Sequence, residues 1–303
     1  MRPALLAAAV VLAAAAPAHA AYPGANGKLV FFQDGVGGTE PIGLAVADAT
    51  GFNQSPNPLG PVCASEGSDP PGPCPRDPIW SPGGTLIAFG LGGTVATMEP
   101  DGSDVRRLPL TGFARVNSPA WSPDGSRIAF SAVRGKTRNV YVTERGGSAV
   151  IALTRAGGAS PAWSTGNEIA FTRGGNLFRM PATGGKVRRL TSRGGLAPTW
   201  STRGKAIAFV RRVKLKRKSK RRTPVLYRFN RTGKRLNRLT RGFSEGPSWT
   251  PNGNSILFTY FDGFNLTIRA VPSEGGRTRQ ITRGQEGRRV AVHSADQQPR
   301  PRP

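Results

Sequence analysis

The stretch Pro119-Ala120-Trp121-Ser122-Pro123-Asp124-Gly125-Ser126-Arg127-Ile128-Ala129-Phe130 decides the fold of this chain. Its centre, Ser122 to Gly125, has the composition of a type I turn, because proline fixes φ at the second position and glycine closes the fourth. The following residues, Ser126 to Phe130, are apolar or β-forming and predict a buried strand. The stretch therefore predicts a tryptophan, a tight turn and a buried strand in succession.

This pattern occurs five times and contains all five tryptophans of the chain, which lie 37 to 49 residues apart. Short strands repeating about every 40 residues are typical of propeller blades. Glycine-centred turns after each copy, such as Gly146-Gly147 and Gly184-Gly185, predict further hairpins, so each unit supplies four strands. We expect the tryptophans to pack in the seams between blades rather than stack on a ligand. They are Trp80, Trp121, Trp163, Trp200 and Trp249.

The two ends of the chain predict a sixth unit. Asn26 to Phe32 repeats the turn and strand without the tryptophan, and Ile42 to Val46 supplies the next strand. The missing first strand is expected to come from Arg289 to Val292, which would close the ring and remove exposed strand edges. The predicted fold class is all-β: a six-bladed β-propeller of four-stranded antiparallel blades, closed by pairing of the N- and C-terminal strands.

The pattern at residues 119–130 resembles the propeller repeat of the TolB family, whose founding protein is the periplasmic partner of the Tol–Pal envelope system. The resemblance covers residues 24–292 and implies a six-bladed fold in the cell envelope, with a binding rather than a catalytic role. Two features depart from the family pattern. We expect this chain to lack the α/β domain that precedes the propeller in TolB, and its turns at 164–166 and 201–204 lack the proline. The chain is therefore similar to stand-alone TolB-like propellers with WD40-like repeats.

Residues 1–20 have the features of a secretory signal peptide. Arg2 provides the basic region, Leu5 to Ala16 the apolar region, and Ala18-His19-Ala20 the cleavage site. We therefore expect an exported bacterial protein, periplasmic or extracellular, and no other segment reaches the length of a membrane span. The propeller is expected to occupy residues 21–293 as a monomer, followed by a disordered Pro/Arg tail at 294–303.

The two cysteines, Cys63 and Cys74, both lie in the Pro/Gly-rich segment 52–76. Because export leads to an oxidising compartment, we expect a disulfide that staples this loop between the first two blades. Their spacing fits neither a CxxC redox motif nor a zinc site.

The chain is strongly basic, with a formal net charge of +26, and residues 211–222 carry nine positive charges in twelve positions. We expect this run to extend a hairpin as an insertion at 211–223. It can act as a polyanion-binding loop that neutralises phosphates, or it can be a solvated loop without a ligand. No aromatic residue interrupts it, so stacking on nucleic-acid bases is not favoured. The candidate binding residues are Arg211, Arg212, Lys214, Lys216, Arg217, Lys218, Lys220, Arg221 and Arg222.

The sequence predicts no catalytic residue, cofactor or metal. The one histidine outside the signal segment, His293, precedes the tail. Gly242 to Gly246 matches G-x-S-x-G, but it precedes a blade strand where a hydrolase requires a helix. Glu66, Asp69 and Asp77 are the acids best placed to converge on Ca²⁺ near a channel mouth, although loops carry such acids routinely.

Three functions remain open. The first, which we favour, is a non-catalytic binding or scaffold propeller for an envelope protein or glycan, contacted through blade loops or the central channel. The second is a module that binds an anionic envelope polymer or lipid headgroups through residues 211–222. The third is a propeller lyase or hydrolase with acids around the axis. Fold alone does not select among them.

Overall fold

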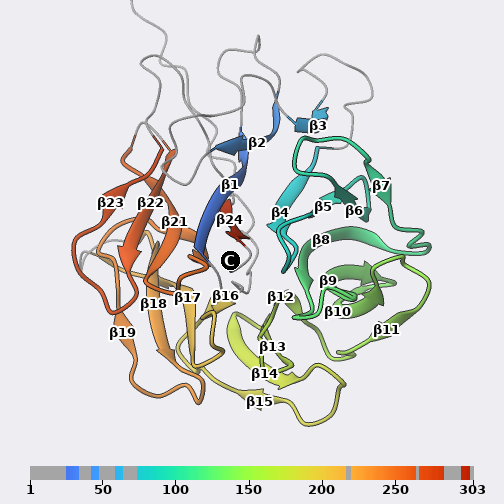
Figure 1. Ribbon diagram of the computed structural model, residues 1–303. Coiled ribbons are helices and arrows are strands. Elements are labelled where there is room, and N and C mark those ends of the chain that lie inside the picture. The colour runs from blue at the N-terminus through green and yellow to red at the C-terminus, as the bar shows by residue number, and fades with distance from the viewer. Residues whose placement is uncertain are drawn as a thin grey trace, which may run out of the picture.

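The computed structural model describes residues 25–33, 42–47, 59–63, 74–215, 220–263, 266–282 and 295–300. The regular structure of these residues consists of 24 strands in six antiparallel, four-stranded sheets. The sheets stand as blades around a common axis (Figure 1). This arrangement confirms the predicted six-bladed propeller, and we number the blades in chain order.

Blades 2 to 4 are each built from four consecutive strands, of which the first lies nearest the axis and contacts the first strand of the next blade. Blade 2 contains β4 (Arg76–Trp80), β5 (Ile87–Leu91), β6 (Thr94–Met98) and β7 (Arg106–Arg107). Blade 3 contains β8 (Ala114–Trp121), β9 (Arg127–Arg134), β10 (Thr137–Glu144) and β11 (Val150–Ala152). Blade 4 contains β12 (Ala159–Trp163), β13 (Glu168–Arg173), β14 (Asn176–Pro181) and β15 (Arg188–Arg189).

Blades 5 and 6 repeat this order, and blade 1 combines the two ends of the described chain. Blade 5 contains β16 (Leu196–Trp200), β17 (Ala206–Val213), β18 (Thr223–Asn230) and β19 (Asn237–Arg238). Blade 6 contains β20 (Glu245–Trp249), β21 (Ser255–Phe261), β22 (Leu266–Pro272) and β23 (Arg279–Gln280). Blade 1 contains β24 (Ala295–Arg300), β1 (Ala25–Gln33), β2 (Ile42–Ala47) and β3 (Leu59–Cys63).

The ring closes as expected through a C-terminal strand, but the strand itself differs from the prediction. β24 pairs antiparallel with β1, with Leu29 opposite Gln297 and Phe31 opposite Ala295. Arg289 to Val292, the expected donor, lies outside the described residues, and the observed strand falls within the segment 294–303 that we expected to be disordered. Backbone hydrogen bonds place β24 beside β1, but β24 lacks the tryptophan that marks the first strand of every other blade. The side-chain pattern therefore gave no guide to its register.

A β-bulge occurs at the same place in the first strand of blades 2 to 6. In each blade, the residue three positions before the tryptophan adopts a positive φ, between 47° and 57°, and a proline follows it. The strand register shifts by one residue across this site. Proline has no N–H to donate to the ladder, so a bulge accommodates it near the axis. The five bulge residues are Asp77, Ser118, Ser160, Ala197 and Gly246.

The turn after each tryptophan is closed by a buried hydroxyl. In blade 3 the Gly125 N–H donates to the Ser122 carbonyl at 2.9 Å, and the Ser122 Oγ accepts the Arg127 N–H at 2.9 Å. Where blade 4 lacks the proline, Asn167 closes the turn instead, with φ of 54° and its N–H 3.1 Å from the Ser164 carbonyl. The same hydroxyl-to-strand hydrogen bond recurs at Ser81, Ser164, Ser201 and Thr250.

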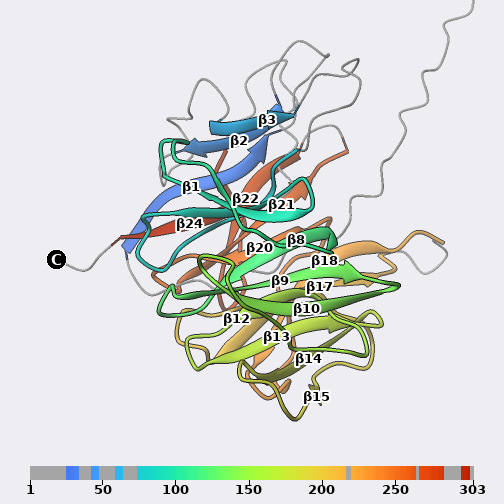
Figure 2. The same ribbon diagram turned by 90° about the vertical axis from the view of Figure 1, so that its right-hand side faces the viewer.

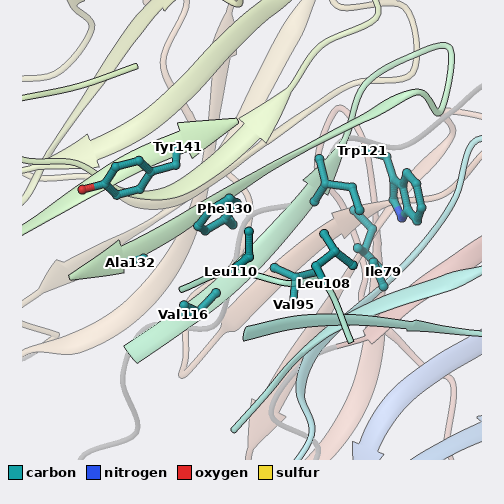
Figure 3. Packing of buried hydrophobic residues seen from close by; sticks show 11 residues of the cluster. Ile79, Val95, Leu108, Leu110, Val116, Trp121, Phe130, Ala132 and Tyr141 are labelled. Carbon is teal, nitrogen blue, oxygen red and sulfur yellow. The ribbon is translucent and has the colours of Figure 1, made fainter. Parts of the chain in front are cut away.

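The hydrophobic core consists of six clusters, each at the junction of two neighbouring blades. Figure 3 shows the junction of blades 2 and 3, where Trp121 and Phe130 of blade 3 pack with Ile79, Val95 and Leu108 of blade 2. All five indole rings are buried. The Nε1–H groups of Trp200 and Trp249 also donate to carbonyls of the preceding blade, Ala162 at 3.1 Å and Thr199 at 3.2 Å. The junction of blades 6 and 1 contains no tryptophan.

Replacing one seam tryptophan should destabilise the whole ring. We expect Trp200→Ala to lower the free energy of unfolding by about 3–5 kcal/mol, because it removes a buried ring and leaves a cavity between two blades. Chemical denaturation followed by circular dichroism measures the change. Ile151→Ala, at a side chain that is 62% exposed, is the control and should change stability by less than about 0.5 kcal/mol. Equal effects of the two substitutions would contradict the assignment of the core to the seams.

The turn of blade 3 predicts a measurable titration. The Ser122 hydroxyl donates to the Asp124 carboxylate at 2.6 Å and the Ser126 N–H donates to it at 3.1 Å. These hydrogen bonds lower the pKa of Asp124 to about 2, so they stabilise the fold above about pH 4 and are lost as the pH falls toward 2. We expect Ser122→Ala to raise this pKa toward its ordinary value, as measured by NMR titration of the carboxyl carbon.

Because Asp124 is exposed, its contribution to stability is small. We expect Asp124→Ala to cost less than about 1 kcal/mol at pH 7, and the difference from the unsubstituted chain should vanish near pH 2. An Asp124 pKa that stays unchanged in the Ser122→Ala variant would show that the hydroxyl is not its cause.

Candidate functional site

The propeller has two faces, which carry different connections between strands. On the first, which we call the turn face, lie the turns after the tryptophans and the turns between the third and fourth strands, joined by hydrogen bonds such as Arg145 N–H to Ser126 carbonyl at 2.8 Å. On the second, the loop face, lie the hairpins between second and third strands and the loops that lead to the next blade. There, the Gly195 N–H donates to the Gly175 carbonyl at 2.8 Å. The basic run belongs to the loop face.

The basic run extends the hairpin between β17 and β18, as its position in the sequence predicted. Arg211 and Arg212 lie near the end of β17, opposite Val225 and Pro224, and Lys220 to Arg222 lead into β18. The hairpin projects beyond the neighbouring blades (Figure 2). Three candidate residues, Lys216, Arg217 and Lys218, lie outside the described residues.

The first residue of the run is part of the scaffold. The Arg211 Nε donates to the Gly194 carbonyl at 3.2 Å, and its guanidinium lies over the rings of Phe209 at 5.4 Å and Tyr227 at 5.0 Å. Burial lowers the pKa of the Arg211 guanidinium, Tyr227 opposes that shift, and the nearby charge of Arg193 adds to it. Arg211 therefore fastens the hairpin to the loop of the preceding blade. Lys214, Lys220, Arg221 and Arg222 are exposed.

A cavity of about 350 Å³ lies on the loop face at the junction of blades 4 and 5. Blade 4 contributes the two-residue turn Gly174-Gly175 and Asn176, and the loop between the blades contributes Arg193 and Gly194. Blade 5 contributes Arg212 and Arg222 from opposite sides of the basic hairpin. The structure therefore brings together two residues of the predicted run and a third arginine that precedes it in the chain.

One carboxylate offsets part of this charge. The Arg212 Nη2 lies 4.0 Å from Glu245 Oε1, with the Glu245 side chain 12% exposed. Arg193 and Arg222 are exposed, and they form no ion pair within the described residues. The cavity consequently has an excess of positive charge at its solvent side.

The G-x-S-x-G sequence lies where the chain passes from blade 5 to blade 6. Ser244 is fully buried, and its Oγ donates to Thr240 Oγ1 at 2.8 Å. Thr240 Oγ1 in turn accepts the Leu226 N–H at 3.0 Å, a contact that Thr154, Thr191 and Thr282 make in their own blades. The strand β20 begins at Glu245, directly after Ser244, so the arrangement is not that of a hydrolase nucleophile, which a helix follows.

The acid Asp77, considered as a calcium ligand, joins two blades instead. Its Oδ2 accepts the Ser118 N–H at 3.0 Å, and both residues are bulge residues of first strands. Glu66, Asp69 and His293 lie outside the described residues. Within the described residues, no group of three or more His, Cys, Asp or Glu side chains is arranged to hold a metal.

Two further predictions concern residues that the structure describes in part or not at all. Cys63 ends β3, but its side chain is not described, so the pairing with Cys74 stays a prediction. The signal segment 1–20 lies outside the described residues. The described part of the chain includes no helix with the length and apolar character of a membrane span.

Sequence reasoning missed Arg193, because it lies in a different blade from the basic run. The signal that could have found it is the repeat itself. Aligning the loops after Thr154 and Thr191 shows that Arg193 occupies the position of Ala156, beside the start of the following blade.

The family of this chain follows from its fold and repeats. A family profile described as the TolB beta propeller domain matches residues 76–294, most of the chain. The chain therefore belongs to the TolB β-propeller family, as the motif at 119–130 indicated. No curated protein matches the sequence.

Solved structures agree with this fold. TolB from Acinetobacter baumannii is similar with a TM-score of 0.72 and 20% identity, over 90% of this chain and 67% of that chain. A protein described as TolB from Agrobacterium tumefaciens has a TM-score of 0.63 and 18% identity, over 89% of this chain and 94% of that chain. An oligogalacturonate lyase in complex with manganese has a TM-score of 0.57 and 10% identity, over 89% and 78% of the respective chains. At these identities the likeness shows the fold alone.

The basic run should divide into scaffold and surface residues. We expect Arg211→Ala to lower the free energy of unfolding by about 1–2 kcal/mol, because it removes a hydrogen bond and contacts with two rings. Lys214→Ala is the matched control, and as an exposed substitution it should change stability by less than about 0.5 kcal/mol. Urea denaturation of both variants measures the difference. An Arg211→Ala variant as stable as the control would make the whole run a solvated loop.

Proposed function

We propose that this protein is an exported, non-catalytic propeller that binds a protein or glycan partner of the bacterial cell envelope through its loop face. Membership of the TolB β-propeller family supports a binding role, and the signal-like segment 1–20 supports export to the periplasm or beyond. In that compartment, the expected disulfide between Cys63 and Cys74 would fix the segment that joins blades 1 and 2.

The observation that carries a binding rather than a catalytic role is the use of polar side chains by the scaffold. Ser244 donates within its own loop, Asp77 accepts a backbone N–H, and Asp124 closes its turn. Glu168 accepts hydrogen bonds from Arg179 of its own blade and from Arg231 of blade 5 at 2.7 Å. Side chains held in this way are committed to the fold and are not free to transfer protons or attack a substrate.

The choice of face follows from the variation among the repeats. On the turn face every described turn after a tryptophan is closed by the same kind of hydroxyl contact, so these turns vary little in length. On the loop face the hairpins between second and third strands range from the two-residue turns Gly92-Gly93 and Gly174-Gly175 to the basic hairpin. Variable loops on a rigid scaffold are where binding specificity resides.

The proposal is tested by charge reversal on one face at a time. Lys136→Glu with Arg155→Glu changes two exposed side chains of the loop face, and Arg145→Glu with Lys186→Glu makes the same change on the turn face. Tagged proteins are cross-linked in envelope extract of the source organism, and the recovered partner is identified and quantified by mass spectrometry.

We expect the loop-face pair to reduce recovery of a specific partner about tenfold, because like charges placed at an interface disfavour association. The turn-face pair, which has the same net charge, should retain recovery within about twofold. Equal loss from both pairs would show that net charge alone governs capture. Turnover of an envelope glycan by the purified protein would replace the binding role by a catalytic one.

A further inference from the structure

The cavity between blades 4 and 5 is lined by three arginines, Arg193, Arg212 and Arg222. The internal repeats provide the comparison, because the loops between blades align through their buried threonines. At the junction of blades 3 and 4, Ala156 stands where Arg193 stands here, and Gly174 stands where Arg212 stands. The junction of blades 3 and 4 therefore forms without these two arginines, so the blade architecture does not require them.

The walls of the cavity are fixed by hydrogen bonds. The Gly194 N–H donates to Asn176 Oδ1 at 3.1 Å, and the Gly194 carbonyl accepts Arg211 Nε. The Gly195 N–H donates to the Gly175 carbonyl at 2.8 Å, which ties the loop to the turn of blade 4. A ligand entering the cavity would therefore meet an ordered surface and lose little free energy to rearrangement.

The turn Gly174-Gly175 has no side chains, so a ligand can reach its backbone directly. Both residues have positive φ, 51° and 70°, as a tight two-residue hairpin requires. A Cβ added at either position would meet nothing within 4 Å, so the glycines border open space. A compact anion can approach the turn closely, and Arg193, Arg212 and Arg222 line the same cavity.

We propose that this cavity is a binding site for a phosphate group. Arginine forks donate paired hydrogen bonds that match the oxygens of a phosphate, and three of them can share its charge. The volume of about 350 Å³ holds a phosphate with part of the molecule that carries it. Glu245 compensates Arg212 in part, which leaves Arg193 and Arg222 as the principal charges for the ligand.

This inference goes beyond the proposed partner-binding role and does not depend on it. The phosphate can belong to a soluble phosphate ester or to a lipid headgroup, since both present the same oxygens. The basic hairpin beside the cavity adds long-range attraction for either source.

The test uses the full mature chain and titration calorimetry with inorganic pyrophosphate at low salt. The variant Arg193→Ala with Arg222→Ala removes two charges, and the alanine at position 193 is the residue that the preceding loop carries as Ala156, so the fold should tolerate it. Arg107→Ala with Arg188→Ala is the matched control, because it removes two exposed arginines from outer strands of blades 2 and 4.

We expect the cavity variant to bind pyrophosphate at least about tenfold more weakly, while the control stays within about twofold. Equal weakening of the two variants, or none in the cavity variant, would overturn the proposal. So would a dicarboxylate such as malonate that binds the unsubstituted chain as tightly as pyrophosphate. Unfolding profiles of both variants establish that the fold is retained.

A second arm identifies the source of the phosphate. The chain is sedimented with vesicles of phosphatidylcholine containing about one third phosphatidylglycerol, at the salt concentration used for calorimetry. Sedimentation that depends on Arg193 and Arg222 supports a lipid headgroup. Pyrophosphate binding without such sedimentation supports a soluble phosphate ester. Failure of the face-reversal experiment with retained pyrophosphate binding would refute the partner-binding role and leave this site standing.

Discussion

Each blade of this protein can bury its two faces only against its neighbours, and the rest of the structure depends on that constraint. The six apolar clusters lie between blades, so no blade has a hydrophobic core of its own. A ring satisfies every blade, whereas an open stack would expose an apolar face at each end. The pairing of β24 with β1 is therefore required for the stability of all six seams.

The local sequence pattern explains why the fold was predictable. The tryptophan, the hydroxyl residue after it and the strand ending in phenylalanine each make the same contact in successive blades, so five copies reinforce one interpretation. The bulge residues were not predicted, because a positive φ at Asp77, Ser118, Ser160 or Ala197 is unusual for a residue with a side chain. The closing strand was predicted at the wrong residues, because β24 lacks the tryptophan that marks the first strands of the other blades.

The candidate site was predicted in part. The basic run stood out by charge density, and its place in a hairpin followed from the strands on either side. The partner of that run, Arg193, could not be found by proximity in the sequence, because the ring brings the end of one blade against the hairpin of the next. Charge density also gave no way to separate Arg211, which holds the hairpin to the scaffold, from Arg222, which faces solvent.

The position of this charge argues for a ligand rather than for solubility alone. Positive charges that serve solubility are best spread over a surface, because like charges in one place repel each other and destabilise the folded state. Here Arg193 and Arg211 are close enough for the charge of one to lower the pKa of the other, and Arg212 and Arg222 border the same cavity. The equivalent positions of the preceding junction hold alanine and glycine, so the fold does not need this arrangement. A bound phosphate would offset the repulsion between these arginines. It would therefore explain why they lie together, whereas a solvated loop without a ligand would not.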